Sequence, residues 1–167
     1  MKRKRISGKL DISPVPQEDG VSCGYCATRA VYDYFGVKGN GLRHRLGTDH
    51  GFLPALPGRD VLEDFLVRID LKVGKYGYSD TVGTYCPDMF AVLCQDGFDS
   101  EGVSGFDIKA KGALRKHIRS GNPAICLISW IHWIVIAGSN ARGAWIVDSQ
   151  NHKPYFRTIN WCRKNIT

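Results

Sequence analysis

Residues 17–36 read QEDGVSCGYCATRAVYDYFG, and this stretch predicts a polar loop that leads into an α-helix. Its apolar residues recur at spacings of three and four, the period of one helix face. They are Cys23, Ala27, Ala30, Val31 and Tyr34. Ser22 stands where a helix N-cap is wanted, and Gly36 is a typical helix-ending residue. The sequence therefore predicts that Cys23 lies in the first turn of a helix.

A cysteine at a helix start has chemical consequences. The unpaired N–H groups and the positive end of the helix dipole favour an anion there. The thiolate, not the thiol, is the nucleophilic form of cysteine. Gln17 lies six residues upstream of Cys23, and its side-chain amide is suited to donate a hydrogen bond to an oxyanion. The sequence thus predicts a nucleophile and an oxyanion donor. The nucleophile still needs a base to take its proton.

The candidate base lies far downstream, in two apolar segments that predict a β-hairpin. Residues 130–138 read WIHWIVIAG and residues 144–148 read AWIVD, with Ser, Asn and Gly between them. His132 would begin one strand and Asp148 would end the next. Antiparallel pairing would then bring the two side chains together, and the carboxylate would hold the imidazole in the tautomer that accepts a proton.

These features resemble the papain-like cysteine protease superfamily, and within it the C39 peptidases and C39-like domains. The matching segments are Gln17-Glu18-Asp19, Cys23-Gly24, His132-Trp133-Ile134-Val135 and Ile146-Val147-Asp148-Ser149. Ser149 departs from the group, which usually has proline there. The resemblance implies a cysteine peptidase with a Cys23–His132–Asp148 triad, Gln17 in the oxyanion hole, and cleavage of a leader peptide after small residues.

The motif Cys23-Gly24-Tyr25-Cys26 has two other interpretations. In papain-type enzymes the second cysteine of such a motif is the nucleophile. Gln17 lies six residues before Cys23 and nine before Cys26, and the resemblance implies the shorter offset. A redox pair at a helix start is the other alternative, but it should follow a buried strand, and residues 14–22 are too polar for one.

The order of predicted elements favours an α+β domain with a papain-like fold, in which N-terminal helices pack on a C-terminal antiparallel sheet. We expect residues 1–16 to form a basic, flexible segment and residues 17–167 to form the peptidase domain. The other predicted elements are helices at 59–71, 87–95 and 112–119, strands at 103–108, 124–129 and 154–159, loop with a short strand at 72–84, and a turn at 161–165.

The net charge of +7 is concentrated at the two ends of the chain. Residues 1–10 carry five basic and no acidic side chains, and residues 152–167 carry four basic and no acidic ones. The body of the chain is nearly neutral. Basic ends are typical of solvated tails or of weak electrostatic contacts with anionic partners.

The remaining expectations concern partners and location. Trp130, Trp133 and Tyr25 are candidate walls of a groove for a peptide or protein substrate, because they neighbour His132 and Cys23 in sequence.

Only one Cys-x-x-Cys is present, so no metal or cofactor is predicted. No signal peptide or membrane span is evident, which favours a cytoplasmic protein or an effector secreted by another route. Acyl transfer by the same triad and peptide binding without catalysis remain alternatives.

Overall fold

The computed structural model describes residues 8–18, 22–46, 84, 86–100, 108–129 and 132–166. Its helices and strands are, in chain order, α1 (Cys23–Phe35), α2 (Leu42–Arg45), α4 (Cys86–Gln95), α5 (Ile108–Arg119), β1 (Ala124–Ile128), β2 (His132–Ser139), β3 (Gly143–Val147), β4 (Tyr155–Thr158) and α6 (Ile159–Asn165). The strands form one antiparallel sheet in the order β1-β2-β3-β4. The predicted α+β class is confirmed.

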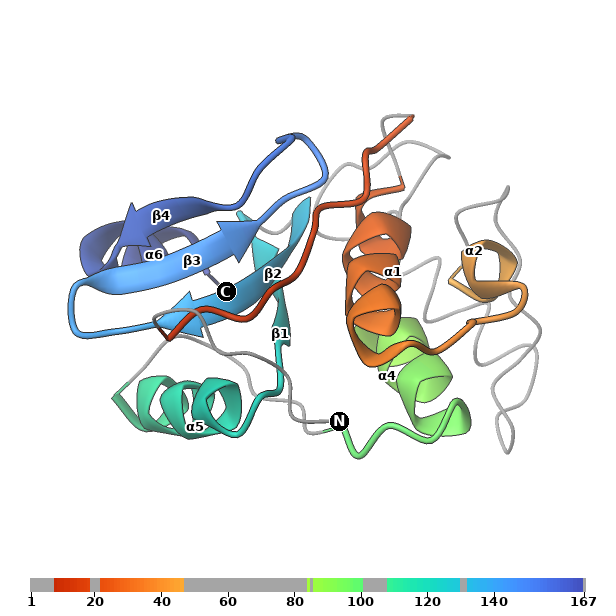
Figure 1. Cartoon of the computed structure of the whole chain (residues 1–167), viewed down its shortest axis with the longest axis horizontal. Helices are drawn as coiled ribbons and strands as arrows, with labels where there is room; N and C mark the ends of the chain where they lie inside the picture. Colours follow the sequence, from red (N-terminus) through yellow and green to blue (C-terminus); the bar gives the residue numbers. More distant parts are fainter. Residues whose placement is uncertain are drawn as a thin grey trace, which may run out of the picture.

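The sheet separates two apolar clusters, because successive residues of a strand point to opposite faces. Along β2, Val135 and Ala137 pack in the cluster that contains the buried face of α1. Ile134 and Ile136 belong to the other cluster, with Cys162 of α6. Figure 1 shows α1, α2 and α4 together to one side of the sheet, with α5 and α6 against its other parts. The central strand β2 is therefore buried from both sides.

Helix α1 is the element that residues 17–36 predicted. It ends at Gly36, whose φ of 73° is left-handed, a conformation that glycine adopts without the penalty of a Cβ. Ser22 occupies the N-cap position, but its hydroxyl makes no cap hydrogen bond there. The helix packs directly on β2. This contact brings the start of α1 toward the strand that begins with His132.

Most of the other predicted elements that fall within the described residues are present, with shifted ends. Helix α5 begins four residues earlier than expected, at Ile108, and a short helix α2 lies where the sequence predicted no helix or strand. The terminal turn predicted at 161–165 is helix α6, whose N-cap Thr158 accepts a hydrogen bond from the Trp161 N–H. The helix predicted at 59–71, the segment 72–83 and most of the strand predicted at 103–108 lie outside the described residues.

Residues 8–16 pack against the sheet, although they were assigned to a flexible segment. The Leu10 N–H donates to the Ala137 carbonyl at 2.6 Å, and Lys9 pairs with Gly138, which lies past the residue of β2 that pairs with Ala124, the first residue of β1. Leu10 and Ile12 are 5% and 3% exposed and belong to the core. Their alternation is a strand-like pattern, but it is too short to stand out beside the basic residues that precede it. Figure 1 shows this stretch in red, running along the sheet toward α1.

Within the described residues, no helix combines the length and the apolar character needed to cross a membrane.

We predict that Ile12→Ala lowers the free energy of unfolding by about 2–4 kcal/mol, as large-to-small changes in a core do. Urea denaturation would measure the change. Ser13→Ala is the matched control, because Ser13 is exposed, and it should stay within about 0.5 kcal/mol of wild type. Equal stability of the Ile12→Ala and Ser13→Ala variants would show that residues 8–16 contribute nothing to the core.

Candidate active site

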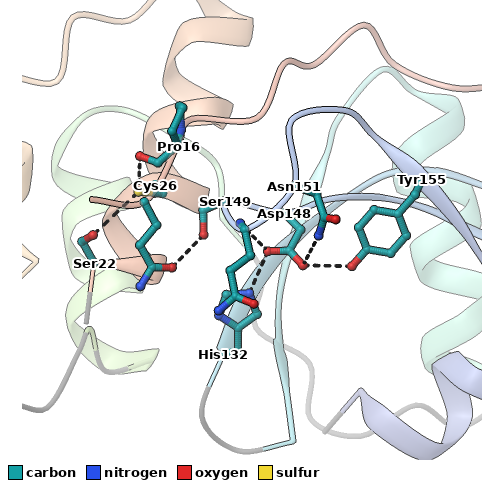
Figure 2. Close-up of polar contacts among 10 residues, drawn as sticks. Pro16, Ser22, Cys26, His132, Asp148, Ser149, Asn151 and Tyr155 are labelled. Carbon is teal, nitrogen blue, oxygen red and sulfur yellow. Dashed lines mark hydrogen bonds and ion pairs between the residues drawn. The ribbon is translucent and has the colours of Figure 1, made fainter. Parts of the chain in front are cut away.

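The hairpin brings His132 and Asp148 together, as its antiparallel pairing predicted. His132 is the first residue of β2, and Asp148 directly follows the last residue of β3. The register pairs Val135 with Val147, so the start of β2 lies beside the end of β3. His132 Nε2 lies 2.8 Å from Asp148 Oδ1. Figure 2 shows this contact at the centre of a row of hydrogen-bonded side chains.

The carboxylate of Asp148 accepts hydrogen bonds on both oxygens. The Gln150 N–H donates to Oδ1 at 3.0 Å, while Asn151 Nδ2 and the Tyr155 hydroxyl donate to Oδ2 at 3.2 and 2.9 Å. Burial would raise the pKa of Asp148, but the hydrogen bonds from His132, Gln150 and Tyr155 outweigh it and lower the pKa to about 2. The carboxylate is therefore ionised throughout the neutral range and fixed in orientation (Figure 2).

The neighbours of His132 raise the pKa of its imidazole. Its pKa is raised to about 9, first by the hydrogen bond with Asp148 and then by a hydrogen bond with the Cys23 side chain, while burial opposes both. Because Nε2 faces Asp148, Nδ1 is the ring nitrogen left for Cys23. The imidazole is thus held between a carboxylate and a thiol, and its charged form is favoured at neutral pH.

Cys23 begins α1 and is 5% exposed. The next residue, Gly24, lies against Thr84 and Trp133, and a Cβ added to Gly24 would collide with the Thr84 side chain. The Trp133 indole N–H donates to the Thr84 carbonyl at 2.8 Å. A glycine after the cysteine therefore lets the helix start approach the β2 strand closely.

Gln17 is tied to the residue that follows Asp148. Its N–H donates to the Ser149 carbonyl at 3.2 Å, and its Oε1 accepts from the Ser149 hydroxyl at 2.9 Å. One residue upstream, the Pro16 carbonyl accepts a weak hydrogen bond from Cys26 Sγ at 3.5 Å (Figure 2). The loop that carries Gln17 is thus fastened to both α1 and the turn after β3. Cys26 itself is buried.

The three aromatic residues predicted to line a substrate groove differ in their placement. Trp133 is 7% exposed and lies in the core beneath Gly24, so it offers little surface to a substrate. Tyr25 is half-buried, and the Arg43 guanidinium lies 5.6 Å from its ring centroid. Trp130 lies outside the described residues.

Sequence reasoning missed the residues that support Asp148. Asn151 follows Asp148 at a spacing common in turns, and that spacing alone could have drawn attention to it. Tyr155 belongs to β4, and only the pairing of β4 with β3 brings its hydroxyl to the carboxylate. The role of the Ser149 hydroxyl likewise depends on a residue far away in the sequence, Gln17.

Among the described residues, no group of three His, Cys, Asp or Glu side chains is arranged to hold a metal ion. The five cysteines whose side chains are described are free thiols: Cys23, Cys26, Cys94, Cys126 and Cys162. Burial raises the pKa of the Cys126 thiol to about 12 and also raises that of Cys162, so both stay protonated at neutral pH.

The fold matches that of a known protease. Comparison with protein-family models and with curated protein sequences finds no match. Among solved structures, the chain is similar to a double glycine motif protease from an AMS/PCAT transporter, crystallised in complex with the leader peptide. The TM-score is 0.57 at 14% sequence identity, covering 96% of this chain and 89% of that one. The predicted papain-like fold is confirmed, and at this identity the likeness concerns the fold alone.

We predict that the stabilising effect of the His132–Asp148 pair weakens as the pH rises from about 6.5 to about 9. The folded-state pKa of His132 is raised to about 9 from an ordinary 6.5, so its contribution is complete below pH 6.5 and is lost through pH 9. The difference in unfolding midpoint between wild type and Asp148→Asn should therefore narrow over this range. Urea denaturation under reducing conditions at several pH values would measure it.

Asp33→Asn is the control for this comparison. Asp33 pairs with Arg29 on the exposed side of α1, and arginine does not titrate in this range. Ionisation of unfolded cysteines affects all three proteins alike, so only differences between them are compared. A constant difference between wild type and Asp148→Asn from pH 6.5 to 9 would contradict the predicted coupling.

Proposed function

We propose that this protein is a cysteine peptidase in which Cys23 is the nucleophile, His132 the general base and acid, and Asp148 the residue that orients His132. The observation that carries the proposal is the position of His132, which lies between the Asp148 carboxylate and the Cys23 side chain and has a raised pKa. A nucleophile, a base and a group that orients the base form the pattern of a catalytic triad.

The first chemical step follows from this arrangement. The proton of Cys23 resides on His132 Nδ1, so the site holds a thiolate–imidazolium pair, and Asp148 stabilises the imidazolium at Nε2. The thiolate attacks the carbonyl carbon of a peptide bond, forming a carbon–sulfur bond and placing the negative charge on the carbonyl oxygen. The first N–H groups of a helix have no partner within it, so the Cys23 N–H is suited to bind that oxygen together with the Gln17 amide.

The following steps return the site to its starting state. His132 donates its proton to the leaving amine, and the carbon–nitrogen bond breaks to leave an acyl group on Cys23. A water molecule, deprotonated by His132, then attacks the thioester and releases the carboxylic acid. Acyl transfer to an amine would use the same residues, with the amine in place of water.

The class of substrate is also part of the proposal. The structural neighbour is described as a double glycine motif protease and was crystallised with the leader peptide. We propose a peptide substrate for this chain too, cleaved after small residues such as a pair of glycines. The alternative is a domain that binds peptides without catalysis. Such a domain would bind the same peptide and leave it uncleaved.

We predict that Cys23 reacts with iodoacetamide at pH 6 at least about ten times faster than Cys94, an exposed thiol that serves as the internal reference. His132→Ala should abolish this advantage. Removing the ring also makes room around the sulfur, so a purely steric effect would speed the reaction instead. Mass spectrometry of peptide fragments would follow both cysteines in the same sample. Equal rates for Cys23 in wild type and His132→Ala would contradict the triad.

We also predict that the protein cleaves short peptide amides that end in Gly-Gly before a fluorogenic amine, and that Cys23→Ala lowers the rate by at least about 10³-fold. Cys94→Ala is the matched control and should retain full activity, because Cys94 lies on the exposed side of α4. A peptide that binds but stays intact, with wild type and Cys23→Ala indistinguishable, would favour the non-catalytic alternative.

A further inference from the structure

The residue after Asp148 makes two hydrogen bonds to Gln17. The Ser149 carbonyl accepts from the Gln17 N–H at 3.2 Å, and the Ser149 hydroxyl donates to Gln17 Oε1 at 2.9 Å. Residues 17 and 149 are far apart in the sequence, so the tertiary structure alone brings them together. The hydrogen bond to the carbonyl positions the backbone at Gln17, and the hydrogen bond from the hydroxyl holds the Gln17 side-chain amide.

The contact on Oε1 decides which way the amide of Gln17 faces. A glutamine amide has one acceptor oxygen and one donor NH₂ group, on opposite sides of the same carbon. A hydroxyl that donates to Oε1 commits the oxygen to the Ser149 side. The NH₂ group is then directed away from Ser149, and only this end of the amide is able to donate to an oxyanion.

The turn that carries Ser149 is itself held firmly. Its first residue, Asp148, accepts hydrogen bonds from His132, Asn151 and Tyr155, and the Asn151 N–H donates to the Asp148 carbonyl at 3.0 Å. The same turn therefore supports the group that orients His132 and the group that contacts Gln17. Figure 2 shows Ser149 next to Asp148 in this network.

We infer that Ser149 is a positioning residue, whose hydroxyl orients the Gln17 amide so that its NH₂ group donates to the oxyanion of the reaction proposed above. The inference rests on that proposed function.

The test compares two reactions of Cys23 that differ in whether an oxyanion forms. Alkylation by iodoacetamide displaces iodide at a saturated carbon and forms no oxyanion. Acetylation by p-nitrophenyl acetate passes through a tetrahedral intermediate that carries one. Both rates are measured for each variant in a Cys94→Ala background, after subtracting the rate of the same protein with Cys23→Ala.

Ser149→Ala should slow acetylation by about 3–10-fold, as the loss of one hydrogen bond does, and leave alkylation unchanged. Ser149→Thr retains a hydroxyl and should restore most of the acetylation rate. Gln17→Ala should slow acetylation by about 10²-fold, as loss of an oxyanion donor does. Adding Ser149→Ala to Gln17→Ala should have no further effect, because the amide that the serine orients is gone. Ser120→Ala, which removes a hydroxyl bonded to the Lys116 carbonyl at the end of α5, is the matched control.

Three results would overturn the inference. Full-speed acetylation by Ser149→Ala, with Gln17→Ala slowed and alkylation normal, would remove the role of Ser149 and leave the proposed function standing. An equal loss from Ser149→Ala with and without Gln17 would show that the serine acts through another group. Alkylation of Cys23 that does not depend on His132 would refute the proposed function and this inference with it.

Discussion

The hydrogen bond between His132 and Asp148 is the interaction on which the rest of the site depends. Both side chains are largely buried, and a buried charge is tolerated only when it is paired and hydrogen-bonded. Asp148 meets this condition with four donors, of which His132, Gln150 and Tyr155 lower its pKa even though burial acts in the opposite direction. The carboxylate in turn raises the pKa of His132, which also shares a hydrogen bond with the Cys23 side chain. The raised pKa of His132 therefore depends on the ionised Asp148, and the ionised Asp148 depends on its hydrogen-bond donors.

The turn after β3 joins parts of the chain that are distant in sequence. It holds Asp148 through Asn151 and Tyr155, and it holds Gln17 through Ser149. The loop before α1 is also fastened by the buried thiol of Cys26 at Pro16. The second cysteine of the Cys-x-x-Cys motif therefore has a packing role in this structure.

Much of the fold was predictable because its central elements have strong local patterns. The helix in residues 23–35 has a regular apolar face and a glycine stop, and the hairpin has two β-branched runs separated by turn residues. Residues 8–16 and helix α6 were misjudged because each is short and contributes only a few buried side chains. Periodicity needs several turns or alternations to be visible, and these segments are stabilised by contacts with distant parts of the chain.

The sequence by itself determined the order and the types of the groups in the site. Local pattern placed Cys23 at a helix start, His132 at a strand start and Asp148 at a strand end, and antiparallel pairing implied that the last two meet. Only the tertiary structure decided which side chains complete the network. Ser149 meets Gln17 and Tyr155 meets Asp148 through the packing of α1, β3 and β4, and Trp133 turns inward to the core. Spacing along the chain carries no information about such contacts, because their geometry is set by the packing of elements against one another.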